Sequence, residues 1–117
     1  MIKVSCLLRT HRLKWGLYQK DLAALVPHTG TDRVSRVERN KRSPNAREIL
    51  AYGMIFGLLA EDVFPGLVSE VEETLIANAY LLHRELEGDS SPKATRRRVF
   101  LEAILARAAD RARSSAQ

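Results

Sequence analysis

The chain has 117 residues, and its 19 Lys and Arg outnumber 14 Asp and Glu, which gives a formal charge of +5. This length supports one small core and excludes large cofactor folds such as eight-stranded barrels, which need about 250 residues. An apolar share of 45% and a charged share of 28% are typical of a folded globular domain and exclude wholesale disorder.

Neither a membrane segment nor a metal site is expected. No apolar run reaches the roughly 18 residues that a membrane span needs, and charge interrupts the first residues too early for a signal peptide. We therefore expect a cytoplasmic protein. The single cysteine, Cys6, excludes an internal disulfide and a cysteine zinc cluster, and is expected as a buried residue of the first helix. The three histidines lack metal-ligand spacing, so no metal or cofactor is predicted.

The positive charge is concentrated in the first half of the chain. Residues 1–66 hold eleven Lys and Arg against six Asp and Glu, whereas residues 67–117 hold eight of each. Six of the basic residues are close together in sequence: Arg33, Arg36, Arg39, Lys41, Arg42 and Arg47. Such a stretch is typical of a surface that binds polyphosphate, although a solvated helix face explains the charge equally well.

Two short helices are predicted first. Apolar spacing indicates one over residues 4–15, which Gly16 ends, and another over residues 19–26, which Pro27 ends. The buried face of the second is expected to carry Leu22, Leu25 and Val26.

A third helix is predicted over residues 31–39, after a turn over residues 26–30. Only Val34 and Val37 in this segment are of a buried type. Because the rest of its surface is polar and charged, this helix needs something polar to face.

A fourth helix is predicted to begin at Asn45, which forms a cap pair with Glu48, and to end at Gly57. Its inner face is expected to carry Ala46, Ile49, Leu50 and Gly53. A brief helical segment over residues 60–64 follows, and the Pro65-Gly66 pair is expected to close the unit.

Residues 67–117 predict a helical hairpin. The apolar stripe of its first helix consists of Val68, Val71, Leu75, Ala79, Leu82 and Leu86, and residues 88–90 end that helix. Ser91 caps the second helix, with Pro92 at its first position. The second stripe consists of Leu101, Ile104, Leu105, Ala108 and Ala112. The chain is therefore predicted to be all-α, with a five-helix unit over residues 1–66 and a two-helix appendage.

The two short helices over residues 19–26 and 31–39 are the parts of a helix-turn-helix, whose second helix enters the major groove of DNA. The strings LRTHR at 8–12, GLYQKDLA at 16–23 and VSRVERNKR at 34–42, followed by Pro44, resemble the Cro/phage-repressor (Xre-like) helix-turn-helix family. Residues 50–64 are similar to the closing helices of that domain. The resemblance covers about residues 4–65 and implies a five-helix repressor-like domain.

The resemblance implies a set of DNA-binding residues: Gln19, Thr31, Asp32, Arg33, Ser35, Arg36, Arg39, Lys41 and Arg42. Gln19 would approach the DNA backbone or a base, with an ordinary helix-opening residue as the alternative. Arg33 and Arg36 would project from the third helix, where a guanidinium fork can bond a guanine. Asp32 would accept from a cytosine amino group or serve only as a helix-start residue. Lys41 and Arg42 would grip phosphate.

Similar domains have an internal ion pair at the positions of Arg12 and Glu38, so a structural role is implied for both. The chain departs from the family pattern at two places. The turn over residues 26–30 is two residues longer, and Tyr18 replaces the usual Thr or Ser cap of the second helix. Tyr18 is expected to pack on Trp15, with contact to the DNA backbone as the alternative.

These observations predict a sequence-specific double-stranded DNA-binding regulator, expected to be a dimeric repressor. Residues 67–117 would build a homodimer, because dimeric readers place two recognition helices about 34 Å apart on DNA. The alternative is a protein-interaction module, such as an antitoxin or adaptor, whose hairpin binds a partner protein. Arg96, Arg97 and Arg98 are expected on a solvated face, with a supplementary phosphate contact as the alternative. No nucleophile, base and oxyanion-donor set can be assembled, so an enzyme is not expected.

Overall fold

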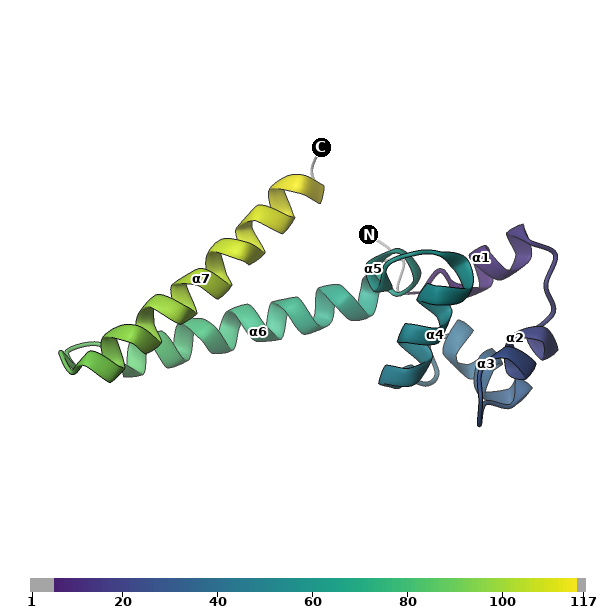
Figure 1. Cartoon of the computed structure of the whole chain (residues 1–117), viewed down its shortest axis with the longest axis horizontal. Coiled ribbons are helices and arrows are strands. Elements are labelled where there is room, and N and C mark those ends of the chain that lie inside the picture. The colour runs from purple at the N-terminus through teal and green to yellow at the C-terminus, as the bar shows by residue number, and fades with distance from the viewer. Residues whose placement is uncertain (1–5, 116–117) are drawn as a thin grey trace. The chain divides into compact units, whose positions relative to one another are not determined.

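A computed structural model describes residues 6–115, and within this range the chain forms seven helices and no strand (Figure 1). The predicted all-α class is confirmed. The helices are α1 (Leu8–Lys14), α2 (Gln19–Leu25), α3 (Thr31–Glu38), α4 (Ala46–Phe56), α5 (Ala60–Val63), α6 (Pro65–Glu85) and α7 (Pro92–Ser115). Val4, predicted to belong to the first helix, lies outside the described residues.

The chain divides into two compact units, one up to Ser69 and one from Glu70 onward, and α6 contributes to both. The Pro65-Gly66 pair was predicted to close the first unit, but Pro65 begins α6. A proline fits the first position of a helix because its missing N–H would have no intrahelical partner there. In no helix of the described range are length and apolar character sufficient for a membrane crossing.

Local side-chain and backbone signals set the ends of α4. The Asn45 side chain accepts a hydrogen bond from the Glu48 N–H at 2.9 Å, and the Glu48 carboxylate accepts one from the Asn45 N–H at 2.8 Å. The helix ends at Gly57, which has a φ of +66° and so adopts the left-handed conformation that glycine tolerates best. Both predicted ends of α4 are therefore confirmed.

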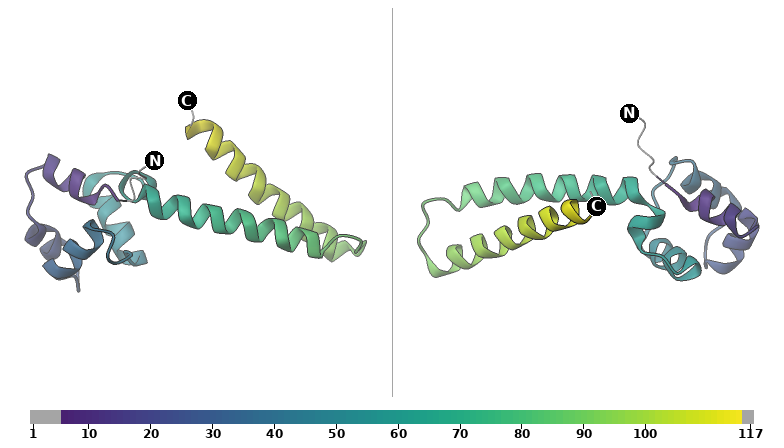
Figure 2. Two further views of the ribbon diagram at one scale, coloured as in Figure 1. Left: turned by 180° about the vertical axis from the view of Figure 1, so that it is seen from behind. Right: turned by 90° about the horizontal axis from the view of Figure 1, so that it is seen from above.

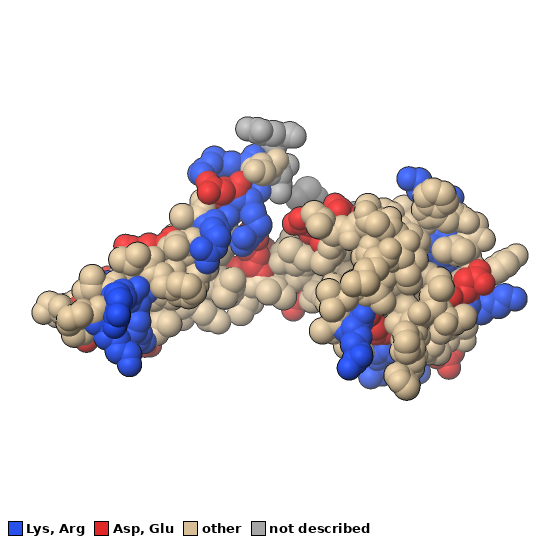
Figure 3. Space-filling view, in the orientation of Figure 1, with Lys and Arg blue, Asp and Glu red and all other residues tan. Residues whose placement is uncertain are grey.

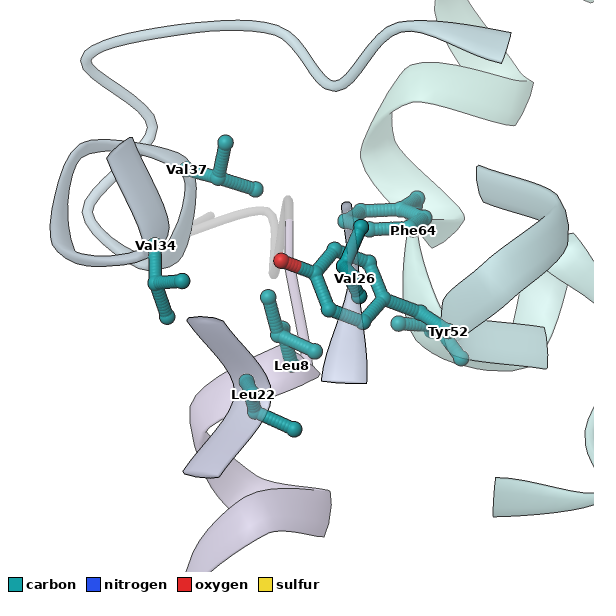
Figure 4. Packing of buried hydrophobic residues seen from close by; sticks show 8 residues of the cluster. Leu8, Leu22, Val26, Val34, Val37, Tyr52 and Phe64 are labelled. Atoms are coloured by element: carbon teal, nitrogen blue, oxygen red, sulfur yellow. The ribbon is translucent and has the colours of Figure 1, made fainter. Parts of the chain in front are cut away.

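The core of the first unit combines side chains from all of its helices. Its buried members are Leu8, Leu22, Val26, Val34, Val37, Tyr52, Val63 and Phe64 (Figure 4). Val34 and Val37 occupy the buried side of α3, as predicted. Leu25 was placed on the buried face of α2, but 57% of its surface is exposed, because Leu22 already fills the inner side of that helix.

The inner face of α4 differs from the prediction. Ala46 and Leu50 are exposed, whereas Glu48 and Tyr52 are buried. Glu48 takes the inner position because it is both a cap residue and an ion-pair partner of α3. Ile49 packs against the core as predicted, so apolar character placed part of this face correctly and missed Glu48 and Tyr52.

The Tyr52 ring lies inside the core, and its hydroxyl points towards the valines of α3 (Figure 4). Among the described residues, this hydroxyl has no hydrogen-bond partner. Burial, reinforced by the negative charges of Glu48 and Glu38, raises the pKa of Tyr52 to about 12. The phenol therefore stays neutral in the folded protein at ordinary pH.

The second unit is an antiparallel pair formed by α6 and α7 (Figure 2). Its small core consists of Ala79, Leu86, Ala94 and Leu101, with Ile104 and Leu105 packed against it. The Ser91 hydroxyl accepts a hydrogen bond from the Ala94 N–H at 3.2 Å, which confirms the predicted cap. Ala108 is also buried, but Ala112 of the predicted stripe is exposed.

Arg98 closes the turn of the hairpin. Its Nη1 donates to the backbone carbonyls of Leu86 at 2.6 Å and Asp89 at 2.8 Å. The expectation that Arg98 lies on a solvated face is therefore wrong, because its guanidinium donates to carbonyls of the turn between α6 and α7. Arg96 and Arg97 are exposed, as expected.

Candidate nucleic-acid interface

The core fixes which side of α3 faces outward. Val34 and Val37 are buried against α2, so the residues between them point elsewhere. Thr31, Asp32 and Arg36 are exposed, and Ser35 is half-buried. The outer face of α3 is therefore polar and accessible.

The turn that joins α2 to α3 is shaped by backbone conformation. Pro27 follows α2, and His28 has a φ of +62°, in the left-handed region that non-glycine residues seldom adopt. Gly30 then occupies the N-cap of α3, without a side-chain cap. A left-handed residue lets this longer connection reverse direction within a few residues.

Arg33 does not project freely from α3 as predicted. Its Nε and Nη2 donate to the two carboxylate oxygens of Glu48, both at 2.5 Å. The Glu48 side chain is almost fully buried, and that of Arg33 is mostly buried. The bidentate pair ties α3 to α4, so Arg33 has a structural role in this structure, and its assignment to base contacts stays a prediction.

The surroundings of Glu48 favour its ionised form. Burial alone would raise its pKa, but hydrogen bonds from Arg33, the Asn45 backbone and Thr29 outweigh that cost and lower it. The same carboxylate raises the pKa of Arg33. Both groups therefore remain charged at neutral pH.

Arg12 and Glu38 form a second internal pair, between α1 and α3. Arg12 Nε lies 2.6 Å and Nη2 3.1 Å from the two Glu38 oxygens, and both residues are buried. Arg12 Nη1 also donates to the Leu17 carbonyl at 2.9 Å. The pair thus holds α3, α1 and the start of the α1–α2 connection in one arrangement.

Gln19 belongs to this internal network. Its Nε2 donates to Glu38 Oε1 at 3.0 Å, and the residue is half-buried. The Gln19 amide thus orients Glu38, and its expected approach to DNA stays a prediction. This hydrogen bond connects α2 to α3.

Basic residues continue past the end of α3. Asn40 has a φ of +59°, and the Lys41 N–H returns to the Arg36 carbonyl at 2.8 Å, which ends the helix. Arg39, Lys41 and Arg42 are exposed, and the Arg39 Nε donates to the Ser35 carbonyl at 3.3 Å. Figure 3 shows several Lys and Arg side chains on the surface of this unit. The cationic surface of α3 therefore comprises Arg36, Arg39, Lys41 and Arg42.

At the start of α2, Tyr18 and Lys20 form a contact that the sequence did not predict. The Tyr18 ring lies 5.4 Å from the Lys20 ammonium, and 67% of this tyrosine is exposed. Trp15 is 66% exposed, so packing on Trp15 buries little of Tyr18, contrary to expectation. The Asp21 carboxylate accepts from the Tyr18 N–H at 2.7 Å, which is the half of a capping box that does not require a hydroxyl at position 18. The positive charge of Lys20, two residues after an aromatic residue, is the sequence feature that could have indicated this contact.

The single cysteine lies close to the start of α1. Cys6 precedes α1 instead of lying on it, is half-buried, and has its pKa raised by burial. Within residues 6–115, no group of three metal-ligating side chains comes together. Comparisons with family profiles, curated proteins and solved structures gave no match to this chain.

Proposed function

We propose that this chain is a sequence-specific double-stranded DNA-binding transcriptional regulator and acts as a dimeric repressor. In this proposal α2, the turn and α3 work as a helix-turn-helix of the Cro/phage-repressor type. The outward face of α3 enters the major groove, and Arg36 reads base edges. Arg39, Lys41 and Arg42 bind phosphates.

One observation carries the proposal: the first unit separates its charges into two classes. Arg12 and Arg33 are engaged in buried ion pairs that position α3, whereas Arg36, Lys41 and Arg42 are exposed around the same helix. A helix held rigidly by its neighbours, with cations on its outer side, has the properties that groove recognition requires. Asp32, exposed in the first turn, would select a cytosine amino group and disfavour nearby phosphate.

The test is selection of bound duplexes from a random DNA library, followed by fluorescence anisotropy on the selected sequence. We expect a palindrome and a salt dependence with a log-log slope of about −0.9 per phosphate neutralised. Arg36→Ala should weaken binding mainly to the selected sequence. Lys41→Ala should weaken binding to all sequences and reduce the slope by about one.

Arg107→Ala provides the matched control, because it removes one exposed positive charge from the second unit. It should leave DNA affinity close to that of the unchanged chain. If no sequence is enriched and Arg36→Ala affects binding no more than Arg107→Ala does, the proposal fails. A promoter-reporter assay with the selected site then separates repression from activation.

A second candidate function is a protein-interaction module, such as an antitoxin or adaptor that binds its partner through the hairpin. The observation that favours it is the exposure of long apolar side chains on α6 and α7, among them Tyr80, Leu81, Val99 and Phe100. A stoichiometric partner protein that co-purifies with the full chain and occupies the hairpin would support this candidate.

A further inference from the structure

The hairpin contains an open groove of about 520 Å³ between α6 and α7. Its apolar lining consists of Leu75, Ala79, Leu82, Phe100, Leu101 and Ile104. Lys93, Arg96 and Arg97 lie along the α7 side, towards the turn of the hairpin. The groove therefore combines an apolar floor with a positively charged end.

The packing within the hairpin leaves this groove uncovered. Two of the four buried core positions are alanines, Ala79 and Ala94, whereas larger side chains beside them stay accessible. Leu75 is 46% exposed and Phe100 63% exposed. A helix pair has no enclosed core of its own, and four helices are the usual number that encloses one.

We propose that a second copy of the same hairpin covers the groove, so that two chains form an antiparallel four-helix bundle. Each copy supplies two of the four helices, and each groove floor covers the other. This inference deepens the dimer of the proposed function and rests on it only for its biological use, because the contact itself requires no DNA.

The sequence of α6 supports a self-complementary contact. Val71, Leu75, Asn78 and Leu82 follow each other at intervals of four, three and four residues, which is the spacing of a coiled-coil seam. Val71, Leu75 and Asn78 also line a second hollow that continues the groove along α6. Asn78, which lines both hollows, is the polar position in this seam, and a single asparagine of this kind fixes the register of paired helices.

The distribution of charge selects a second copy and sets its direction. The positive side chains Lys93, Arg96 and Arg97 lie near the turn, whereas Glu70 lines the groove's continuation at the far end. In a two-fold contact, each residue pair occurs twice, with the roles of the copies exchanged. An antiparallel arrangement therefore brings the positive end of each hairpin to Glu70 of the other copy. A parallel arrangement would instead set like charges against each other.

The first experiment is sedimentation of the full chain without DNA over a range of micromolar concentrations. We expect twice the 13.2 kDa mass of one chain. Leu75→Glu should weaken association by about a hundredfold or more, because each dimer would bury two unpaired carboxylates. Tyr80→Glu, at an exposed position outside the groove lining, is the matched control and should keep the dimer. Circular dichroism checks that both variants remain helical.

Oxidative cross-linking tests the register without depending on affinity. In Asn78→Cys, two copies of the new thiol should meet near the two-fold axis and form a covalent dimer. Tyr80→Cys should not cross-link, and the unchanged chain provides the background from Cys6. Glu70→Arg should weaken association severalfold, and adding Arg97→Glu to the same chain should restore it by exchanging the signs.

Several outcomes would overturn the inference. These are a monomer mass throughout, equal effects of the Leu75 and Tyr80 variants, or association only with a different protein. DNA binding is measured separately, so a monomer that still selects a sequence refutes the bundle and leaves the proposed function standing. A dimer that selects no DNA sequence supports the bundle and refutes the proposed function.

Discussion

The two units of this chain bury their apolar side chains and ion pairs to different degrees. In the first unit, large side chains such as Leu8, Tyr52 and Phe64 are almost completely buried, and two arginine–glutamate pairs are enclosed with them. In the hairpin, the most buried positions include small alanines, and the ion pair between Arg111 and Glu72 remains accessible. The first unit encloses a core of large side chains together with its ion pairs, whereas the core of the hairpin is smaller and long apolar side chains along its groove remain exposed.

The largest expected effect comes from breaking the pair between Arg12 and Glu38 in the first unit. Glu38→Ala leaves the Arg12 guanidinium buried without its carboxylate and also removes the acceptor of Gln19. We expect a loss of about 3–5 kcal/mol in the free energy of unfolding, measured by urea denaturation. A loss below about 1 kcal/mol would mean that water reaches this pair, and the contrast between the units would disappear.

A smaller loss is expected at Glu48, which holds α3 through Arg33 and also caps α4. Glu48→Ala should cost about 1.5–3 kcal/mol, the range for hydrogen bonds that involve charged groups. Arg36→Ala is the matched comparison, because it removes an exposed arginine from the same helix and should change stability by about 0.5 kcal/mol or less.

The pH dependence of stability gives an independent test of Glu48. Its pKa is lower in the folded chain than in the unfolded chain, so its stabilising contribution is complete at neutral pH. That contribution is lost as the pH falls below about 4.3 and through the lowered folded value. Glu48→Gln should flatten this part of the stability curve. An unchanged acid slope would show that other carboxylates dominate it.

Tyr52 is expected to have an effect of the opposite sign. Its hydroxyl is buried and lacks a hydrogen-bond partner among the described residues, so Tyr52→Phe should stabilise the chain by about 1 kcal/mol. Because folding raises the pKa of Tyr52 to about 12, the unchanged chain should lose stability as the pH rises from about 10 to 12. The phenylalanine variant should lose less over that interval. Destabilisation of this variant would reveal a water or partner at the hydroxyl.

Local signals account for the features that sequence predicted well. Gly16 and Gly57 adopt positive φ values at helix ends, and Asn45 and Ser91 cap the helices that follow them. These interactions involve residues within about four positions of each other, so they can be recognised without the fold. The buried side of α3 was also predictable, because Val34 and Val37 are its only apolar residues.

Contacts between distant residues account for the features that the sequence did not predict. Arg33 lies four residues before Val37 and so borders the buried face of α3, but only the position of Glu48 on α4 determines that its guanidinium is engaged there. Gln19 is occupied by Glu38, nineteen positions away. Charge alone does not distinguish the six basic residues between 33 and 47, whereas the ion pair with Glu48 sets Arg33 apart from the exposed ones.

The smallest expected effect belongs to the hairpin. Arg111 Nε lies 2.9 Å from a Glu72 oxygen, but the Arg111 side chain is 47% exposed, so solvent screens the pair. Glu72→Ala should therefore change the stability of the full chain by less than about 1 kcal/mol, in contrast to Glu38→Ala. Urea denaturation of both variants at low and high salt provides the measurement. Strong salt sensitivity combined with a loss above about 2 kcal/mol would contradict the contrast, because the hairpin would then depend on its own ion pair for stability.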